Sequence, residues 1–157
     1  MFLERLQKDN PKFMEAMVNL QQNGALLPDS YAVDMEQFRE NAAAIVNSAK
    51  EKGINDVLVV TGSGMVRRGQ VQPMLDGFEE NGIRYVVQTF DHPDPTSDDV
   101  EAGYKTYKEN GCKSIVALGG GSRIDCAKGI AAKAVHPKKT VAQLQGLLKV
   151  HWPIPPF

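Results

Sequence analysis

The residues best suited to chemistry form a glycine-rich turn. Gly119-Gly120-Gly121-Ser122 follows an apolar run and precedes a helix-forming stretch. Glycine permits backbone angles closed to other residues and leaves no side chain between peptide N–H groups and an anion. A helix beginning near Ile124 would add unsatisfied N–H donors and a partial positive charge, and the Ser122 hydroxyl can donate another hydrogen bond. The turn therefore predicts a site for the phosphates of a dinucleotide, NAD or NADP.

Asp125 follows one turn into the expected helix. A carboxylate repels phosphates, so we expect Asp125 to accept hydrogen bonds from a nicotinamide carboxamide or from a loop amide. The alternative is a tight strand-to-helix turn whose glycines serve geometry alone. Three consecutive glycines followed by a serine and an aspartate favour nucleotide binding.

A second glycine turn, Thr61-Gly62-Ser63-Gly64, follows an earlier apolar run. It resembles the opening of a Gly-x-Gly-x-x-Gly fingerprint, but Arg67 stands at the third glycine position. Gly62 and Ser63 therefore either contact the cofactor or belong to a flexible turn. Arg67 and Arg68 either neutralise a 2′-phosphate or are solvated. In a variant of this hypothesis, Asp91 binds the ribose.

The elements that must position these turns alternate regularly from residue 55 onward. Apolar runs predict buried strands over 56–60, 83–89 and 114–118. Between them, helical spacing predicts a helix from about Val71 to Gly82 and another from Thr96 or Ser97 to Gly111. The expected fold is α/β, a parallel Rossmann-like sheet of at least three strands flanked by helices. In such sheets ligands collect at the carboxyl ends of the strands.

Residues 1–54 are expected to form a helical leader. One helix follows Asn10-Pro11, a short strand is possible over 31–34, and a clearer helix runs from Met35 to Ala49 and stops at Gly53. Beyond the third strand we expect a short helix around 141–148. The proline-rich residues 152–157 must be extended. They lead toward a further strand that the chain does not reach.

Composition limits the classes of function. The 157 residues are 42% hydrophobic and 24% charged with a net charge of −1, which gives no field for nucleic acid or an anionic membrane. Cys112 and Cys126 have no metal or redox spacing, and we expect a cytoplasmic protein. His92, His136 and His151 are too scattered for a metal site. We predict no metal site and name no catalytic residue.

Gly119–Lys128, with the sequence GGGSRIDCAK, resembles the hallmark Gly-Gly-Gly-Ser-x-x-Asp-x-x-Lys of the iron-activated (group III) alcohol dehydrogenases. The resemblance spans residues 55–157 and includes the 59–62 strand and turn, the 93–96 turn, the 111–113 lead-in and the closing 146–156 segment. It implies an NAD(P)-dependent oxidoreductase that acts on alcohols and aldehydes.

Carried over by residue, the resemblance implies that Gly120, Gly121 and Ser122 contact the pyrophosphate and that Asp125 lies near the nicotinamide side. Gly62 stands where many relatives carry an aspartate for the ribose 2′-hydroxyl, so NADP becomes at least as plausible as NAD. Asp94 replaces the usual asparagine between two prolines, which changes that contact.

The family's helical domain, whose aspartate and three histidines bind a divalent metal, has no counterpart in this sequence. The resemblance therefore implies a dinucleotide-binding domain truncated before the metal-binding domain and inactive alone.

Residues 1–54 resemble another family over a shorter stretch, the alanine-racemase-like fold-type III PLP enzymes. The similarity rests on Asn10-Pro11, on 28–30, on Asp34 and on Glu40-Asn41, but 57–61 lacks the cofactor lysine. A hybrid gene product and an unusual leader both remain open. Two alternative functions follow: a PLP-binding fragment, and a non-enzymatic interaction or assembly module, including a homo-oligomer, that uses an unpaired sheet edge.

Overall fold

The computed structural model describes residues 29–145 and 153–156. Its centre is a parallel sheet of β1 (Asp56–Thr61), β2 (Arg84–Thr89) and β3 (Ser114–Leu118) in the order β2-β1-β3. The helices are α3 (Asp29–Glu51), α4 (Ser63–Arg67), α5 (Gln72–Glu80), α6 (Ser97–Glu109) and α7 (Gly121–Val135), with a 3₁₀ turn η1 (Ala142–Leu144). The predicted fold class is confirmed. The chain divides into two compact units, 1–41 and 42–157, and the sheet belongs to the second.

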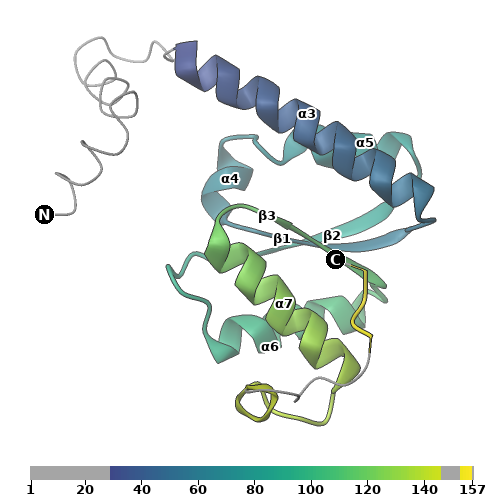
Figure 1. Ribbon diagram of the computed structural model, residues 1–157, viewed down its shortest axis with the longest axis vertical. Coiled ribbons are helices and arrows are strands. Elements are labelled where there is room, and N and C mark those ends of the chain that lie inside the picture. The colour runs from purple at the N-terminus through teal and green to yellow at the C-terminus, as the bar shows by residue number, and fades with distance from the viewer. Residues whose placement is uncertain (1–28, 146–152, 157) are drawn as a thin grey trace, which may run out of the picture. The chain divides into compact units, whose positions relative to one another are not determined.

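Strand β1 is buried because helices cover both faces of the sheet (Figure 1). Val57 and Val59 pack on one face, whereas Leu58 and Val60 pack on the other, and all four are 0% exposed. This alternation explains the continuous apolar run, because both sides of the strand face a core.

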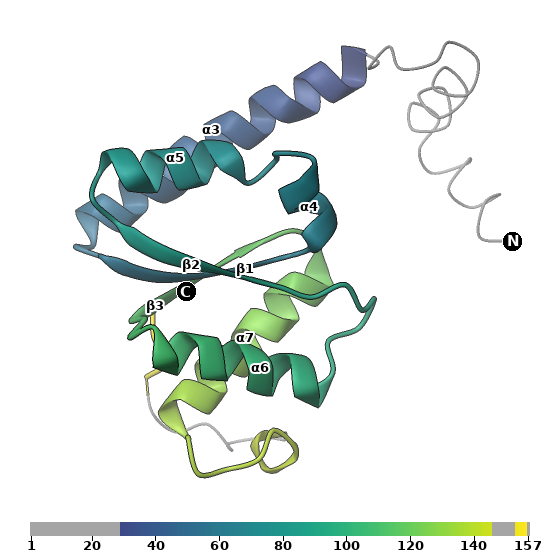
Figure 2. The ribbon, with the colours of Figure 1, turned by 180° about the vertical axis from the view of Figure 1, so that it is seen from behind.

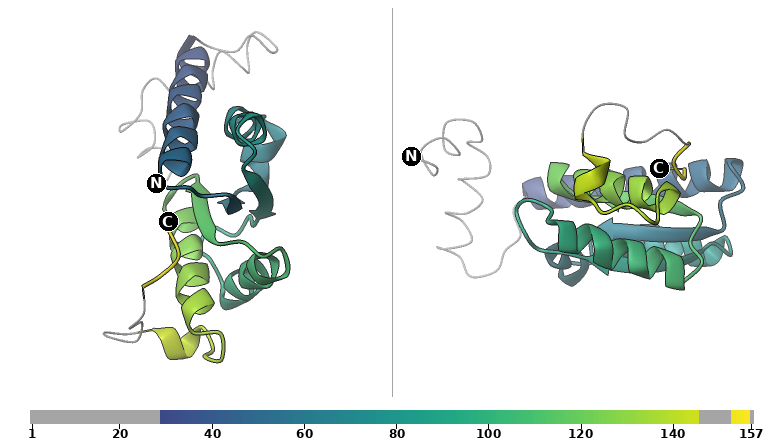
Figure 3. Two further views of the ribbon diagram at one scale, coloured as in Figure 1. Left: turned by 90° about the vertical axis from the view of Figure 1, so that its right-hand side faces the viewer. Right: turned by 90° about the horizontal axis from the view of Figure 1, so that it is seen from below.

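The second half of α3, residues 42–51, covers one face of the sheet together with α5 (Figure 2). The predicted α3 stripe is confirmed at Ala42, Val46 and Ala49, which are buried against β1 and α5. Helices α6 and α7 lie side by side on the opposite face (Figure 3).

Two glycines allow α6 and α7 to approach closely. A Cβ placed on Gly103 of α6 would lie 2.3 Å from Cδ1 of Ile130 in α7. Reciprocally, a Cβ on Gly129 of α7 would lie 2.9 Å from Cγ2 of Val100 in α6. A branched side chain of each helix therefore packs against a glycine of the other. This close packing fixes the position of α6 relative to α7.

Glycines end three of the helices and a threonine begins α6, as predicted from the sequence. Gly53, Gly82 and Gly111 follow helices with φ of +64°, +66° and +62°, angles that side chains disfavour. Thr96 caps α6: its hydroxyl accepts from the Asp99 N–H, while the Asp99 side chain accepts from the Thr96 N–H. This reciprocal pair is a capping box.

Some predicted boundaries were wrong. Residues 31–34 belong to α3 rather than to a strand, because local backbone bonds extend a helix whereas four isolated residues form no ladder. Ser63 begins helix α4 instead of continuing a loop, and α7 begins at Gly121, before Ile124. The predicted helix after Asn10 and residues 146–148 lie outside the described residues. No helix of the described ranges is long and apolar enough to cross a membrane.

Replacing Gly103 with alanine is expected to lower the free energy of unfolding by about 1–3 kcal/mol, because the new methyl group overpacks the buried Ile130. Alanine favours a helix over glycine by about 1 kcal/mol, so propensity alone predicts the opposite sign. Urea denaturation followed by circular dichroism measures the change. Adding Ile130→Val, which removes Cδ1, should restore part of the loss. A Gly103→Ala protein as stable as the wild type would contradict the close approach.

Candidate functional site

The glycine turn lies at the carboxyl end of β3 and opens toward solvent. Gly119, with φ of +142°, ends the strand, Gly120 is the N-cap of α7 and Gly121 is its first residue. All three are exposed, and a Cβ on Gly120 or Gly121 would meet nothing within 4 Å. The space in front of this turn is therefore open to a ligand.

The amides of the turn remain available. The first hydrogen bonds at the start of α7 run from the N–H groups of Arg123 and Ile124 to the Gly120 carbonyl, at 3.0 and 3.4 Å. Within the described part of the chain, the N–H groups of Gly120, Gly121 and Ser122 donate to no protein acceptor. Free amides at the N-terminus of a 15-residue helix attract an anion.

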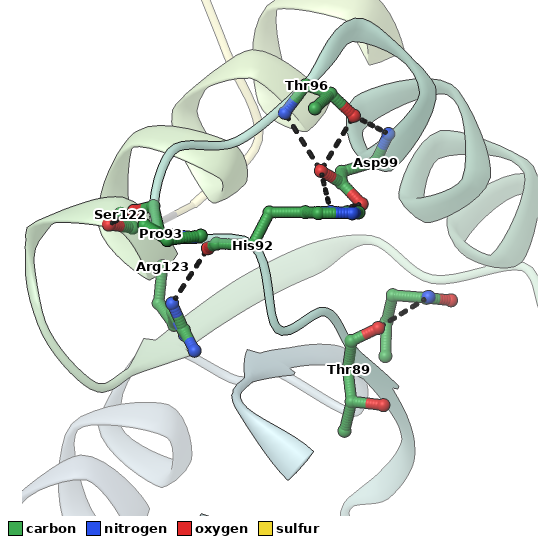
Figure 4. A network of polar contacts seen from close by, with 8 residues as sticks. Thr89, His92, Pro93, Thr96, Asp99, Ser122 and Arg123 are labelled. Atoms are coloured by element: carbon green, nitrogen blue, oxygen red, sulfur yellow. Dashed lines mark hydrogen bonds and ion pairs between the residues drawn. The ribbon is translucent and has the colours of Figure 1, made fainter. Parts of the chain in front are cut away.

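The Ser122 hydroxyl has a protein partner, which sequence reasoning missed. It donates to the Pro93 carbonyl in the loop after β2, as the stick view shows (Figure 4). Ser122 thereby ties that loop to the glycine turn. Its hydroxyl reaches a phosphate only by leaving Pro93, whereas its backbone N–H is free to donate directly.

Asp99 organises the loop that carries Pro93. Its carboxylate accepts from the N–H and hydroxyl of Thr96 at 2.8 and 2.7 Å and lies 3.0 Å from Nδ1 of His92 (Figure 4). Burial raises the pKa of Asp99, but the hydrogen bonds from Thr96 and His92 outweigh it, so the pKa lies below its usual 3.8. Asp94, in the same loop, is exposed.

The second glycine turn is held by Asp91. Its carboxylate accepts from the Ser63 N–H at 3.0 Å and from the Ser63 hydroxyl at 2.6 Å. Arg67 in turn donates to the Ser63 hydroxyl at 3.0 Å. The hydrogen bonds from Ser63, with the charges of Arg67 and Arg123, lower the pKa of Asp91. Asp91 thus caps α4 in place of the missing side chain at Gly62.

Arg123 connects the two turns. A Cβ on Gly62 would lie 2.7 Å from its Nη2, and a Cβ on Gly119 would lie 3.0 Å from its Cγ. Its guanidinium carbon lies 4.8 Å from the centre of the Phe90 ring, within cation–π range. Sequence reasoning missed Arg123, because it fills a variable position of the glycine motif and only the fold brings it to Gly62.

The structure brings most of the predicted site residues to one end of the sheet. The Thr61 hydroxyl donates to the Leu118 carbonyl at 2.8 Å, so the turns that begin at Gly62 and Gly119 lie beside each other. Asp125, in the first turn of α7, is exposed, and its carboxylate lies 3.5 Å from the ammonium of Lys128.

Histidine, cysteine and acidic side chains form no second centre within the described residues. The described ranges contain no cluster of three or more histidine, cysteine or acidic side chains that could hold a metal ion. Cys112 and Cys126 are free and buried, and burial raises the pKa of Cys126 to about 11. The Cys126 thiol is therefore unreactive, because the thiolate is the nucleophile and a raised pKa keeps the thiol protonated.

A groove of about 470 Å³ lies along the outer edge of β3. Its walls are mostly apolar and include Ile45, Ile54, Val116, Ala117 and Ile124. At one end, the Ile115 N–H donates to the Pro156 carbonyl at 3.0 Å, so a backbone segment contacts this edge. Such a surface suits packing of another chain segment and offers little to a phosphate.

Comparison with known proteins decides the family. A family model described as iron-containing alcohol dehydrogenase matches residues 35–155. The chain belongs to this family. A 1,3-propanediol dehydrogenase of Citrobacter freundii is 33% identical over 123 residues, which are 76% of this chain and 32% of that protein. The match to the family model includes residues 35–54, which in the sequence analysis belong to the leader that resembles PLP enzymes.

Solved structures of iron-containing alcohol dehydrogenase relatives agree with the fold. A 1,3-propanediol oxidoreductase superposes with a TM-score of 0.68 at 29% identity, covering 73% of this chain and 30% of that one. A sulfoacetaldehyde reductase from Bifidobacterium kashiwanohense in complex with NAD⁺ gives 0.61 at 28% identity, covering 73% and 29%. The chain thus spans about a third of the length of these relatives.

Asp99→Asn should destabilise the protein in a pH-dependent way. Because the folded-state pKa of Asp99 is lowered, its stabilisation is present above the unfolded value of 3.8 and is lost as the pH falls through the folded value. We expect the variant to melt below the wild type at neutral pH and the difference to shrink below about pH 4. Thermal melts from neutral to acid pH measure it. A difference that does not change with pH would refute the charge-based account.

Proposed function

We propose that this chain binds NAD or NADP as the nucleotide-binding part of an iron-containing alcohol dehydrogenase. The observation that carries the proposal is the turn Gly119–Ser122, whose three glycines are exposed and whose free amides begin α7 at the carboxyl end of a parallel strand. Among the anions that such a turn could bind, membership of this family favours a dinucleotide. The relative solved with NAD⁺ supports this choice of cofactor.

The donor set fits a pyrophosphate. Backbone N–H groups of Gly120, Gly121 and Ser122 would hold the phosphate oxygens, helped by the partial charge of the helix. Gly62 and Ser63 would contact the adenosine side, Asp125 the nicotinamide side, and Asp94 the loop edge of the site. A bound nicotinamide would accept or supply the hydride of an alcohol–aldehyde interconversion.

We propose that the metal and substrate groups of the reaction lie in the part of the relatives that this chain does not match. The described residues do not fit the metal, because they hold no cluster of ligands for it. Hydride transfer requires the substrate to be held against the nicotinamide. We therefore expect these 157 residues to bind cofactor and to lack turnover alone.

An interaction or assembly module is a second candidate function. The apolar groove along β3 favours it, since apolar side chains beside an edge strand can pack against another chain. Light scattering distinguishes the candidates: a mass that stays at one chain at every concentration argues against self-assembly. The PLP hypothesis gains no such support, because β1 carries no lysine.

Gly120→Val is expected to weaken NADH and NADPH binding by about 100-fold or more while the fold is retained. The backbone at Gly120, with φ of −77° and ψ of −175°, is open to any residue, and its Cβ would meet nothing within 4 Å. The new side chain would instead fill the space in front of the amides. Cofactor fluorescence or calorimetry measures binding.

Ala102→Val, on the exposed surface of α6, is the control for side-chain size. Unchanged binding by Gly120→Val would mean that the anion lies elsewhere. If the wild type fails to bind either cofactor at millimolar concentration, the proposed function is wrong.

A further inference from the structure

Arg123 occupies the place of a side chain that Gly62 lacks. The guanidinium lies against Gly62 from the first turn of α7, with Nη2, Nε and Cζ at 2.7, 3.1 and 3.3 Å from a Cβ built there. Any larger residue at position 62 would displace the guanidinium. The end of β1 therefore presents a positive charge that comes from α7.

The guanidinium is held in place without using its full hydrogen-bonding capacity. The centre of the Phe90 ring, a residue that is 7% exposed, lies 4.8 Å from the guanidinium carbon of Arg123. Nη1 of Arg123 donates to the His92 carbonyl at 3.4 Å (Figure 4). A guanidinium has five N–H donors in a planar fork that matches two oxygens of a phosphate. Within the described chain, Arg123 donates only this one long hydrogen bond. An anion can therefore be bound without dismantling an existing ion pair.

The charges around Arg123 favour an anion as well. Helix α4 and its C-cap residue add Arg67 and Arg68 beside the second glycine turn, where a Cβ on Gly64 would lie 3.1 Å from Nη1 of Arg68. The nearby carboxylate, Asp91, already accepts hydrogen bonds from Ser63. Three arginines against one occupied aspartate give a local positive excess in a chain whose net charge is −1.

The position of the Arg123 guanidinium indicates which part of the cofactor it can contact. In dinucleotide-binding sheets, the adenosine ribose is read beside the glycine turn, by a carboxylate that accepts from the 2′-hydroxyl in NAD or by an arginine that binds the 2′-phosphate in NADP. Here β1 is the neighbour of β3, and its end carries Gly62 with Arg123 against it. No carboxylate stands at that position.

Resting on the proposed dinucleotide site, we propose that Arg123 binds the 2′-phosphate of NADP(H) and is the residue that makes the site prefer NADP(H) over NAD(H). Arg67 and Ser63 support the same phosphate from α4. The competing assignment gives the ribose hydroxyls to Asp91 and makes the site prefer NAD(H).

The test is the binding of NADPH and NADH to the 157-residue protein and to Arg123→Gln, by calorimetry. We expect the wild type to bind NADPH at least about 10-fold more tightly than NADH. Arg123→Gln should weaken NADPH by about 10- to 100-fold and leave NADH nearly unchanged. Arg123→Lys, which keeps the charge but loses the fork, should fall between them.

Two adenosine nucleotides that differ in the position of one phosphate test whether Arg123 contacts the 2′-phosphate. 2′,5′-ADP and 5′-ADP carry similar charge, but only the first has a ribose 2′-phosphate, so Arg123→Gln should weaken 2′,5′-ADP selectively. Lys105→Gln, an exposed cation of α6, is the control for the loss of one charge. Circular dichroism checks that each variant is folded.

The remaining outcomes overturn the inference in distinguishable ways. Equal losses for NADPH and NADH would place Arg123 on the pyrophosphate, and a wild type that prefers NADH would favour Asp91. Both outcomes leave the proposed function standing. A wild type that binds neither cofactor overturns the proposed function and this inference together.

Discussion

The structure depends on one constraint, the burial of β1 on both faces. Four consecutive residues, Val57–Val60, are completely buried, so helices must cover both sides of the sheet. Parallel neighbours on each side then align three carboxyl ends at one edge. The two glycine turns lie side by side because β1 and β3 are adjacent, and the Thr61 hydroxyl joins their ends. The candidate site is thus a consequence of strand order.

Much of this arrangement is predictable from the sequence, because its causes are local. Continuous apolar runs indicate buried parallel strands, and the glycines that end the helices mark positions where φ must be positive. The turn Gly119–Ser122 is recognisable because the phosphate contacts proposed for it require residues without side chains. Its open surface and free amides in the structure agree with that requirement.

The rest escaped prediction because it depends on contacts between distant segments. Nothing local distinguishes Arg123 from a solvated arginine, and its place is set by Gly62 and Phe90, which belong to other elements. Ser122 reads as a phosphate donor, yet folding brings the Pro93 carbonyl to its hydroxyl. For residues 31–34, which belong to α3, the sequence allows a short strand because four residues carry too little periodicity to separate a strand from a helix.

The reciprocal glycine contacts between α6 and α7 have a consequence for ligand binding. Helix α6 begins beside the loop that holds Pro93, and α7 begins at Gly121, so the two borders of the site start from helices locked together at Gly103 and Gly129. Neither border can shift far without moving its partner. The proposed cofactor would therefore meet two borders that are already packed against each other. Little of its binding free energy would then be spent on ordering these two helices.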